Sequence, residues 1–346
     1  MKAAIFKGPG LIAVEERPKP EIQLPTDAVV RIVRTCVCGS DLWYYNGDSP
    51  HDESGIGHEA LGVVEATGSA VRSVKTGDLV IVPFAYSDNT CPHCENGVQT
   101  ACVDGGFFGG GELGCQAEFL RVPLADGTAV AVPEGKYDDA QLASLLTLSD
   151  VMGTGYHAAV AAEVKPGHTV AVVGDGAVGL SGVLAAKLLG ASRIIVLGST
   201  HAPRHELARK WGATDLITVR GDDAVTELFE LTNGVGADAV LECVGSKTAT
   251  ETAFAIARPG AIVGRVGLPH DAPIDAEGTF LRNIGMRGGP APVREYLPEL
   301  LEATLRGDIT PGDVFDYVTD LEHIDEAYQA MQQRRAIKAL IKVSEV

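Results

Sequence analysis

The sequence has no segment suited to a membrane and too few basic residues to suit nucleic acid. Its apolar runs are short: Val183 to Ala186, for example, ends at Lys187, and none could span a bilayer. The segment from Met1 has no signal-peptide h-region, which predicts a cytoplasmic protein. Lys and Arg number 28 against 46 Asp and Glu, a formal net charge of −18. Because such a surface repels phosphate backbones and anionic lipids, we expect no nucleic-acid partner and no membrane partner.

The chain also has no internal repeat and no low-complexity tract, and its 346 residues suffice for two domains. Residues 1–150 are predicted to be β-rich, because short β-branched runs alternate with Gly, Pro, Asn and Asp. From Thr169 to Arg287 predicted strands alternate with helices, which indicates a parallel, doubly wound sheet in an α/β chain. Pro290 and Pro292 interrupt this pattern, and two helices and a last strand are expected after them.

Cysteine is scarce, and the seven that occur are unevenly placed. An odd number gathered in clusters indicates metal binding or catalysis before disulfides in a reducing compartment. Cys38 is followed by His58 and Glu59, and thiol, imidazole and carboxylate are ligand types that zinc accepts. The cysteines expected to be buried apolar thiols are Cys36, Cys115 and Cys243.

A glycine-rich turn predicts a dinucleotide site. The strand-like run Thr169–Val173 leads into G-x-G-x-x-G and then into a helical pattern. The first glycine permits a tight turn, the second lets the backbone approach a pyrophosphate, and the third allows close helix–strand packing. Amides and the dipole at the helix N-terminus favour the phosphates. The predicted phosphate-binding residues are Gly174, Gly176, Ala177, Val178 and Gly179.

The next strand, Arg193–Leu197, is not followed by the Asp or Glu that accepts from the ribose 2′-hydroxyl of NAD. Small and polar residues follow instead, with room, donors and positive charge for a 2′-phosphate. The residues predicted to contact it are Gly198, Ser199, Thr200 and Arg204, with His201 as an alternative source of charge. This favours NADP(H) over NAD(H); the alternative is an ordinary loop with solvated basic residues.

The order and spacing of the motifs resemble the zinc-dependent medium-chain alcohol dehydrogenases, across nearly the whole chain. The matching segments are Cys38–Asp41, Gly57–Val64, Gly77–Val80, Gln116–Phe119 and Gly174–Gly179. The resemblance implies a GroES-like, zinc-binding catalytic domain at residues 1–150, completed by 290–346, and a Rossmann domain at 151–289.

By the same resemblance a catalytic zinc is expected on Cys38, His58 and Asp150, with Glu59 as a transient ligand or a residue behind the ligands. Ser40 matches the hydroxyl that binds the substrate alcohol and relays its proton. The family often has a histidine three residues after this hydroxyl. Here Trp43 stands there and is expected to line the substrate pocket, and His51 is an alternative relay.

The family's structural zinc lobe spaces four cysteines as C-x2-C-x2-C-x7-C. Asp88 stands where the first is expected, before Cys91, Cys94 and Cys102. A carboxylate oxygen can bind zinc, so three thiolates and one carboxylate are predicted. His93 is an alternative to Asp88, and a lobe without metal is the other alternative.

The resemblance further places Lys338 on the cofactor pyrophosphate, with a surface lysine as the alternative, and the backbone at Val244 and Val266 beside the nicotinamide. The implied reaction is hydride transfer between an alcohol, expected to be secondary, or its ketone or aldehyde, and NADP(H). Alternatives are an NAD-dependent polyol or formaldehyde-type dehydrogenase, a zinc-free quinone reductase, and a non-catalytic NADPH-binding protein. A homotetramer or homodimer is expected.

Overall fold

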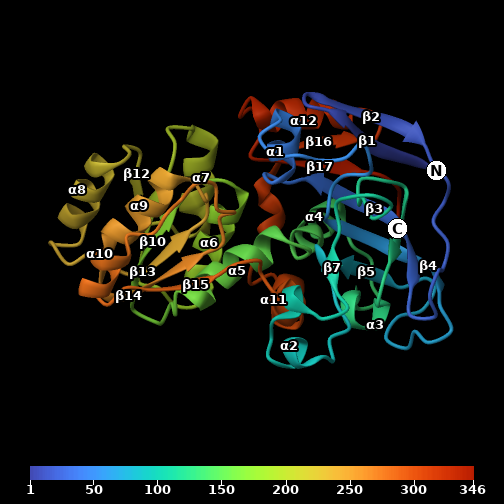
Figure 1. The fold of residues 1–346 in the computed structure, drawn as a ribbon, viewed down its shortest axis with the longest axis horizontal. Coiled ribbons are helices and arrows are strands. Elements are labelled where there is room, and N and C mark those ends of the chain that lie inside the picture. The colour runs from blue at the N-terminus through green and yellow to red at the C-terminus, as the bar shows by residue number, and fades with distance from the viewer. The chain divides into compact units, whose positions relative to one another are not determined.

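The computed structural model describes all 346 residues and divides them into two compact units. Residues 1–150 and 292–346 form the first unit, and residues 151–291 form the second. In Figure 1 the first unit joins the blue N-terminal strands to the red C-terminal ones. The predicted α/β class, with a β-rich domain and a Rossmann domain, is confirmed. None of the helices has the length and apolarity needed to cross a membrane.

The first unit is built on a seven-stranded sheet in the order β16-β17-β3-β4-β5-β9, with β8 also paired to β3. The last strand of the chain, β17, pairs antiparallel with β3 and sets Leu340 opposite Cys36. Apolar side chains such as Val30, Ile32 and Leu120 fill its core. The strands are β3 (Ala28–Val37), β4 (Ala60–Thr67), β5 (Leu79–Val82), β8 (Phe119–Val122), β9 (Val130–Ala131), β16 (Phe315–Asp320) and β17 (Lys338–Lys342).

Shorter elements complete this unit, among them a β1–β2 hairpin that opens the chain and a two-stranded β6–β7 sheet. Their bounds are β1 (Lys2–Gly8), β2 (Leu11–Glu16), β6 (Ala85–Tyr86), β7 (Gly106–Phe107), α1 (Asp41–Asn46), α2 (Pro92–Glu95), η1 (Gln99–Ala101), α3 (Ala125–Thr128), α4 (Asp139–Thr147), α11 (Val293–Arg306), η2 (Pro311–Val314) and α12 (Ile324–Gln332). The helix α4 begins at Asp138, whose carboxylate accepts from the Gln141 N–H in a capping box.

The second unit is a six-stranded sheet in the order β12-β11-β10-β13-β14-β15, and all its pairings are parallel. The strands are β10 (Thr169–Val173), β11 (Arg193–Leu197), β12 (Asp215–Ile217), β13 (Ala237–Glu242), β14 (Ala257–Arg265) and β15 (Gly285–Gly288). The helices are α5 (Val151–Ala161), α6 (Ala177–Leu188), α7 (Ala202–Trp211), α8 (Asp222–Leu231), α9 (Lys247–Ile256) and α10 (Ala276–Leu281). The central strands are almost continuously buried, as expected for a sheet covered on both faces.

Among the helices not expected from the sequence are α4 and α5, which stand on either side of Asp150. Sequence reasoning depends on an apolar stripe opposite a polar face, and α5 lacks that contrast because nearly all of its residues are buried. The consequence for the site is that Asp150 projects from a short, buried break between two helices.

Candidate active site

A cluster of metal-binding side chains lies within the first unit, formed by Cys38, His58, Glu59 and Asp150. Their ligand atoms all lie within 4.8 Å of one another. His58 Nε2 lies 3.2 Å from Asp150 Oδ2, and the Cys38 thiol donates to the same oxygen at 3.6 Å. Thiol, imidazole and carboxylate groups that converge in a buried site are a donor set that suits zinc. The structure therefore brings together the four residues predicted as catalytic zinc ligands.

Local backbone geometry explains how two of these ligands reach the site. Cys38 follows the last residue of β3, and its N–H donates to Asp41 Oδ2 at 2.9 Å. His58 follows Gly57, whose φ is +82°, a value that favours glycine. A Cβ on Gly57 would also lie 2.4 Å from Cγ of Gln116, so no larger residue fits. The glycine before the histidine is therefore required by both backbone and packing.

Asp41 positions His58 from behind. Its Oδ1 lies 3.3 Å from His58 Nδ1, while its Oδ2 accepts from Gln116 Nε2 at 3.3 Å as well as from the Cys38 N–H. Burial alone would lower the pKa of His58, but the charges of Asp41 and Cys38 outweigh it and raise the pKa well above its ordinary value. A carboxylate on Nδ1 leaves Nε2 free to bind a metal, the usual role of a carboxylate behind a ligating histidine. Asp41 was not predicted as a site residue, although it ends the Cys38–Asp41 motif.

Glu59 carries a buried ion pair. Its Oε1 lies 2.7 Å from Nζ of Lys338, and neither side chain is more than 1% exposed. The same ammonium donates to the Val37 carbonyl at 3.2 Å. Burial raises the pKa of Glu59, and the Lys338 charge works against that rise. Lys338 was predicted to contact a pyrophosphate, whereas the structure gives its ammonium two buried partners beside the ligand cluster.

The second carboxylate oxygen of Glu59 tests whether a cation fits here. Oε2 is buried and has no hydrogen-bond partner. An unpartnered buried carboxylate oxygen is costly unless a cation or donor meets it. Since Glu59 belongs to the cluster of ligand atoms, a zinc ion held by the other three residues would lie near its carboxylate and offer this oxygen a positive charge.

The residues expected near the substrate occupy different positions. Ser40 is the N-cap residue of α1 and is partly exposed. His51 has its two ring nitrogens 2.7 and 2.9 Å from the carbonyl oxygens of Asp52 and Gly109, which disfavours it as a proton relay. Phe84, which the sequence did not single out, stacks on Phe107 at 6.0 Å.

Phe84 also presents its ring to the ligand cluster. Its centroid lies 6.3 Å from that of His58, with an interplanar angle of 79°. Phe107, its stacking partner, is 52% exposed, whereas the neighbouring Phe108 is buried against Tyr86. Phe84 and its partner Phe107 therefore contribute an aromatic surface beside the cluster.

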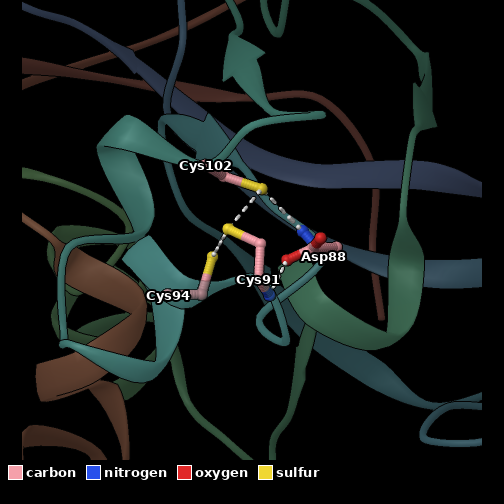
Figure 2. Close-up of side chains that lie close together, drawn as sticks. All are labelled: Asp88, Cys91, Cys94 and Cys102. Atoms are coloured by element: carbon pink, nitrogen blue, oxygen red, sulfur yellow. Dashed lines mark hydrogen bonds between the residues drawn. The ribbon is translucent and has the colours of Figure 1, made fainter.

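The second predicted zinc site is also assembled in space. Figure 2 shows the three sulfur atoms turned toward one another, with Asp88 beside them. Sγ of Cys91 lies 3.6 Å from Sγ of Cys94 and 3.9 Å from Sγ of Cys102, so no pair forms a disulfide. The four ligand atoms lie within 4.8 Å of one another, a donor set that suits a closed zinc site.

Asp88 is held in an ionised state suited to a ligand. Its Oδ1 accepts from the main-chain N–H groups of Thr90 and Cys91 at 2.8 and 3.0 Å. These bonds, the Thr90 bond foremost, lower the pKa of Asp88 to about 2. Its own N–H donates to Sγ of Cys102 at 3.3 Å. His93, the alternative ligand, does not belong to this group.

The glycine-rich turn after β10 has the geometry expected of a phosphate-binding turn. Gly174 has a φ of +108°, and a Cβ on Gly179 would lie 2.0 Å from the Gly174 carbonyl oxygen. Gly176 caps α6, and a Cβ there would meet nothing within 4 Å, which leaves its backbone open to a ligand. Ala177 and Val178 form the first turn of α6.

The loop after β11 contains a contact that the sequence did not suggest. Asp175, the middle residue of the glycine turn, accepts from the N–H and the hydroxyl of Ser199 at 2.8 and 2.5 Å. Its other oxygen accepts from Nη1 of Arg204 at 3.2 Å. Burial raises the pKa of Asp175, but the Ser199 donors and Arg204 outweigh it and lower the pKa overall. Gly198 is required here, since a Cβ would lie 2.7 Å from the Asp175 side chain.

The two backbone turns expected beside a nicotinamide lie together at the ends of β13 and β14. Glu242 joins them: its Oε1 accepts from the N–H of Val244 at 2.9 Å, and its carbonyl accepts from the N–H of Val266 at 2.9 Å. A Cβ on Gly245 would lie 1.9 Å from the Leu268 carbonyl oxygen, so the backbones are in direct contact.

The fold and the ligand clusters define a class, the two-domain zinc-binding dehydrogenases, and comparison with known proteins agrees. The family model described as the alcohol dehydrogenase GroES-like domain matches residues 24–134. The model described as zinc-binding dehydrogenase matches residues 177–306. Together these matches cover most of both units.

Individual relatives narrow the class. Zinc-type alcohol dehydrogenase B of Aspergillus flavus is 34% identical over 100% of this chain and 82% of its own. Sorbitol dehydrogenase of Bacillus subtilis is 31% identical over 98% of this chain and 94% of its own. The solved alcohol dehydrogenase of Thermus sp. ATN1 superposes with a TM-score of 0.91 at 32% identity, covering 99% of this chain and 100% of that one.

The chain therefore belongs to the zinc-dependent medium-chain alcohol dehydrogenase family. Membership implies Zn²⁺, a nicotinamide cofactor and a small-molecule alcohol as substrate.

Proposed function

We propose that the protein oxidises secondary alcohols, and reduces the corresponding ketones or aldehydes, at the cluster of Cys38, His58 and Asp150. The convergence of these three side chains, with the unpartnered oxygen of Glu59 among them, is the observation that carries the proposal. A zinc-free quinone reductase has no use for this ligand set. A non-catalytic NADPH-binding protein also has no reason to keep Asp41 behind His58.

The chain's own residues have separate tasks in this proposal. Cys38, His58 and Asp150 hold the metal, and Asp41 keeps the proton of the imidazole on Nδ1. Bound zinc supplies a Lewis acid for the alcohol or carbonyl oxygen, and bound nicotinamide supplies the hydride acceptor or donor. Ser40 accepts the proton of the alcohol and passes it outward, a role assigned by family resemblance.

The nature of the surface beside the cluster supports an apolar alcohol. Phe84 and Phe107 present stacked rings next to His58, and neither can hydrogen-bond several hydroxyl groups. The similarity to a sorbitol dehydrogenase makes polyols the second candidate substrates. A panel of secondary alcohols, primary alcohols, formaldehyde and polyols distinguishes these options by kcat/KM.

The structural zinc is the second part of the proposal. Asp88, Cys91, Cys94 and Cys102 are proposed to bind it, and the ionised Asp88 carboxylate supports their closed site. Gln99, beside this lobe, donates to Glu295 of α11 at 2.9 Å. A metal here would brace the lobe against the C-terminal part of the unit.

For the coenzyme, the sequence and the structural contacts lead to different expectations. The sequence favoured NADP(H), because Ser199, Thr200 and Arg204 can serve a 2′-phosphate. In the structure Ser199 and Arg204 already serve the carboxylate of Asp175.

The proposed assembly is a homodimer or homotetramer, and the open edge of the second sheet supports it. The edge strand β15 carries Met286, 45% exposed, and α10 carries Phe280 and Leu281, 79% and 70% exposed. Apolar side chains on an edge strand and its neighbour favour association. A cytoplasmic location is likewise proposed, supported by seven unbridged cysteines.

The test combines metal analysis with turnover. Protein dialysed against buffer is analysed for zinc and assayed for alcohol-dependent reduction of NAD⁺ and NADP⁺. The Cys38→Ser variant should lose alcohol oxidation by about 100-fold or more, because it removes a thiolate ligand. Full oxidation activity in Cys38→Ser would show that the proposed zinc mechanism is wrong.

A further inference from the structure

The glycine-rich turn contributes an acidic side chain to the loop that follows the second strand of the fold. Asp175 stands between Gly174 and Gly176, yet its carboxylate does not face solvent. Its oxygens meet Ser199 and Arg204, residues that follow β11. Asp175 is 7% exposed, and three donors fix its orientation.

The Asp175 carboxylate lies beside the loop that follows the second strand, which binds the adenosine ribose in dinucleotide-binding folds. An acid at the end of the second strand accepts from the adenosine ribose 2′-hydroxyl of NAD. The sequence has no acid at 198–204, which is why the loop suggested NADP. The structure supplies one from a different loop, in contact with Gly198 and Ser199.

The geometry points to Asp175 as the residue that reads the adenosine ribose, and we propose that it selects NAD(H) against NADP(H). The inference rests on the proposed dinucleotide site and reverses the coenzyme preference favoured by the sequence. Oδ1 of Asp175 accepts only from Arg204, at 3.2 Å, and so retains a lone pair for a ribose hydroxyl.

A 2′-phosphate would meet opposition at the same place. To use the Ser199 hydroxyl and the Arg204 guanidinium, it would have to displace the Asp175 carboxylate or stand beside it. Displacement leaves a buried carboxylate without its donors, and coexistence places two anions in contact. Specificity of this kind, by repulsion of the wrong ligand, needs no new contact to the right one.

Removing the negative charge of Asp175 would remove both obstacles to a 2′-phosphate, the displaced carboxylate and the contact between two anions. Asp175→Asn keeps the size of the side chain and an oxygen for Ser199, but carries no negative charge. Arg204 is then available to a phosphate, and its side chain is only 16% exposed, so the charge interaction is poorly screened. The variant should therefore gain affinity for the 2′-phosphorylated ligand and lose some for the ribose diol.

Binding of fragments that lack nicotinamide tests the inference without any turnover. Calorimetric titrations of ADP-ribose and of 2′-phospho-ADP-ribose are made with the full-length wild type and with Asp175→Asn. The wild type should bind ADP-ribose about tenfold or more tightly than 2′-phospho-ADP-ribose. In Asp175→Asn the ratio of the two dissociation constants should shift about tenfold or more in favour of the phosphorylated ligand.

A matched control removes the same charge elsewhere in the second unit. Asp238 pairs with Arg258 at 2.6 Å and, like Asp175, has a lowered pKa, but it lies near the start of β13, whereas Asp175 follows the carboxyl end of the neighbouring strand β10. Asp238→Asn should leave the ratio of dissociation constants unchanged.

The outcomes separate the inference from the proposed function. A ratio that Asp175→Asn changes by less than about twofold overturns the role of Asp175 while dinucleotide binding stands. A wild type that prefers the phosphorylated ligand also overturns it. Failure of both ligands to bind overturns the proposed dinucleotide site itself.

Discussion

Replacement of Asp41 by asparagine should weaken zinc binding at the Cys38 cluster without removing any ligand. The carboxylate serves three donors: Oδ2 accepts from the N–H of Cys38 and from Gln116, and Oδ1 lies against Nδ1 of His58. The Gln116 amide cannot turn over freely, since its oxygen accepts from the hydroxyl of Tyr328 at 2.8 Å. An asparagine offers one oxygen where the carboxylate offers two.

The size of the effect follows from the tautomer of His58. If the new amide keeps its oxygen on the Cys38 N–H, its NH₂ group faces Nδ1, which must then accept. The imidazole proton moves to Nε2, the nitrogen 3.2 Å from Asp150 that would bind the metal. Restoring the binding tautomer leaves a buried donor without an acceptor, which costs about 1–3 kcal/mol. Zinc affinity should therefore fall by about 10- to 100-fold.

The assay is chelator competition at the catalytic site. Activity is followed during incubation with graded chelator and after zinc is added back, while total zinc is measured in parallel. The control is Asp325→Asn on α12, a carboxylate that accepts from the N–H of Ile12 at 3.0 Å and from Tyr45 at 3.3 Å. It should lose stability but keep zinc affinity. If Asp41→Asn holds zinc as tightly as the control does, the positioning role of Asp41 is refuted.

Three further predictions concern the lobe, the second sheet and the assembly. Asp88→Ala should lower bound zinc by one ion per chain and reduce the melting temperature, as loss of a structural zinc does, whereas His93→Ala should change neither; metal analysis and calorimetry decide this. Burial raises the pKa of Asp238, but a main-chain N–H and Arg258 outweigh it and lower the pKa overall. The contribution of Asp238 to stability is therefore present above the unfolded-state pKa of about 3.9 and is lost as pH falls through the lower folded-state pKa. Asp238→Asn should reduce the free energy of unfolding by about 1 kcal/mol near neutral pH and by progressively less below about pH 4, as measured by urea unfolding. Met286→Glu on the open edge of β15 should shift the protein to a smaller species in light scattering, and an unchanged mass would exclude this edge from the interface.

Elements governed by backbone requirements were predictable from the sequence. Gly174 and Gly179 are needed for a positive φ and for a close approach of the main chain, and such demands are visible as glycine at fixed spacing. The strand Thr169–Val173 was predicted with the bounds that the structure has, because a fully buried parallel strand is a continuous apolar run. The helix α5 escaped prediction for the converse reason, since its burial on nearly all sides erases the helical period.

Partners of charged side chains were not predictable in the same way. Lys338 and Glu59 are 279 residues apart in the chain, and they meet because β17 and β4 both pair with β3. The family resemblance identified Lys338 as a residue of interest, but not the oxygen that its ammonium contacts. Sequence spacing describes what a side chain can reach along its own element, whereas an ion pair depends on which strands are neighbours in the sheet.

The partners of Asp175 were also not predictable from the sequence, and they bear on the expected coenzyme preference. A sequence search for the ribose-binding acid considers only the residues that directly follow the strand ending at Leu197. A residue from another loop can lie beside the same position in the folded chain. The first and second strands of a Rossmann sheet are adjacent, so the middle residue of the glycine turn lies beside the loop after the second strand. An acid there therefore serves the same region as an acid after Leu197. Because Asp175 binds both Ser199 and Arg204, the coenzyme preference of this chain cannot be assigned from the Gly198–Arg204 loop alone.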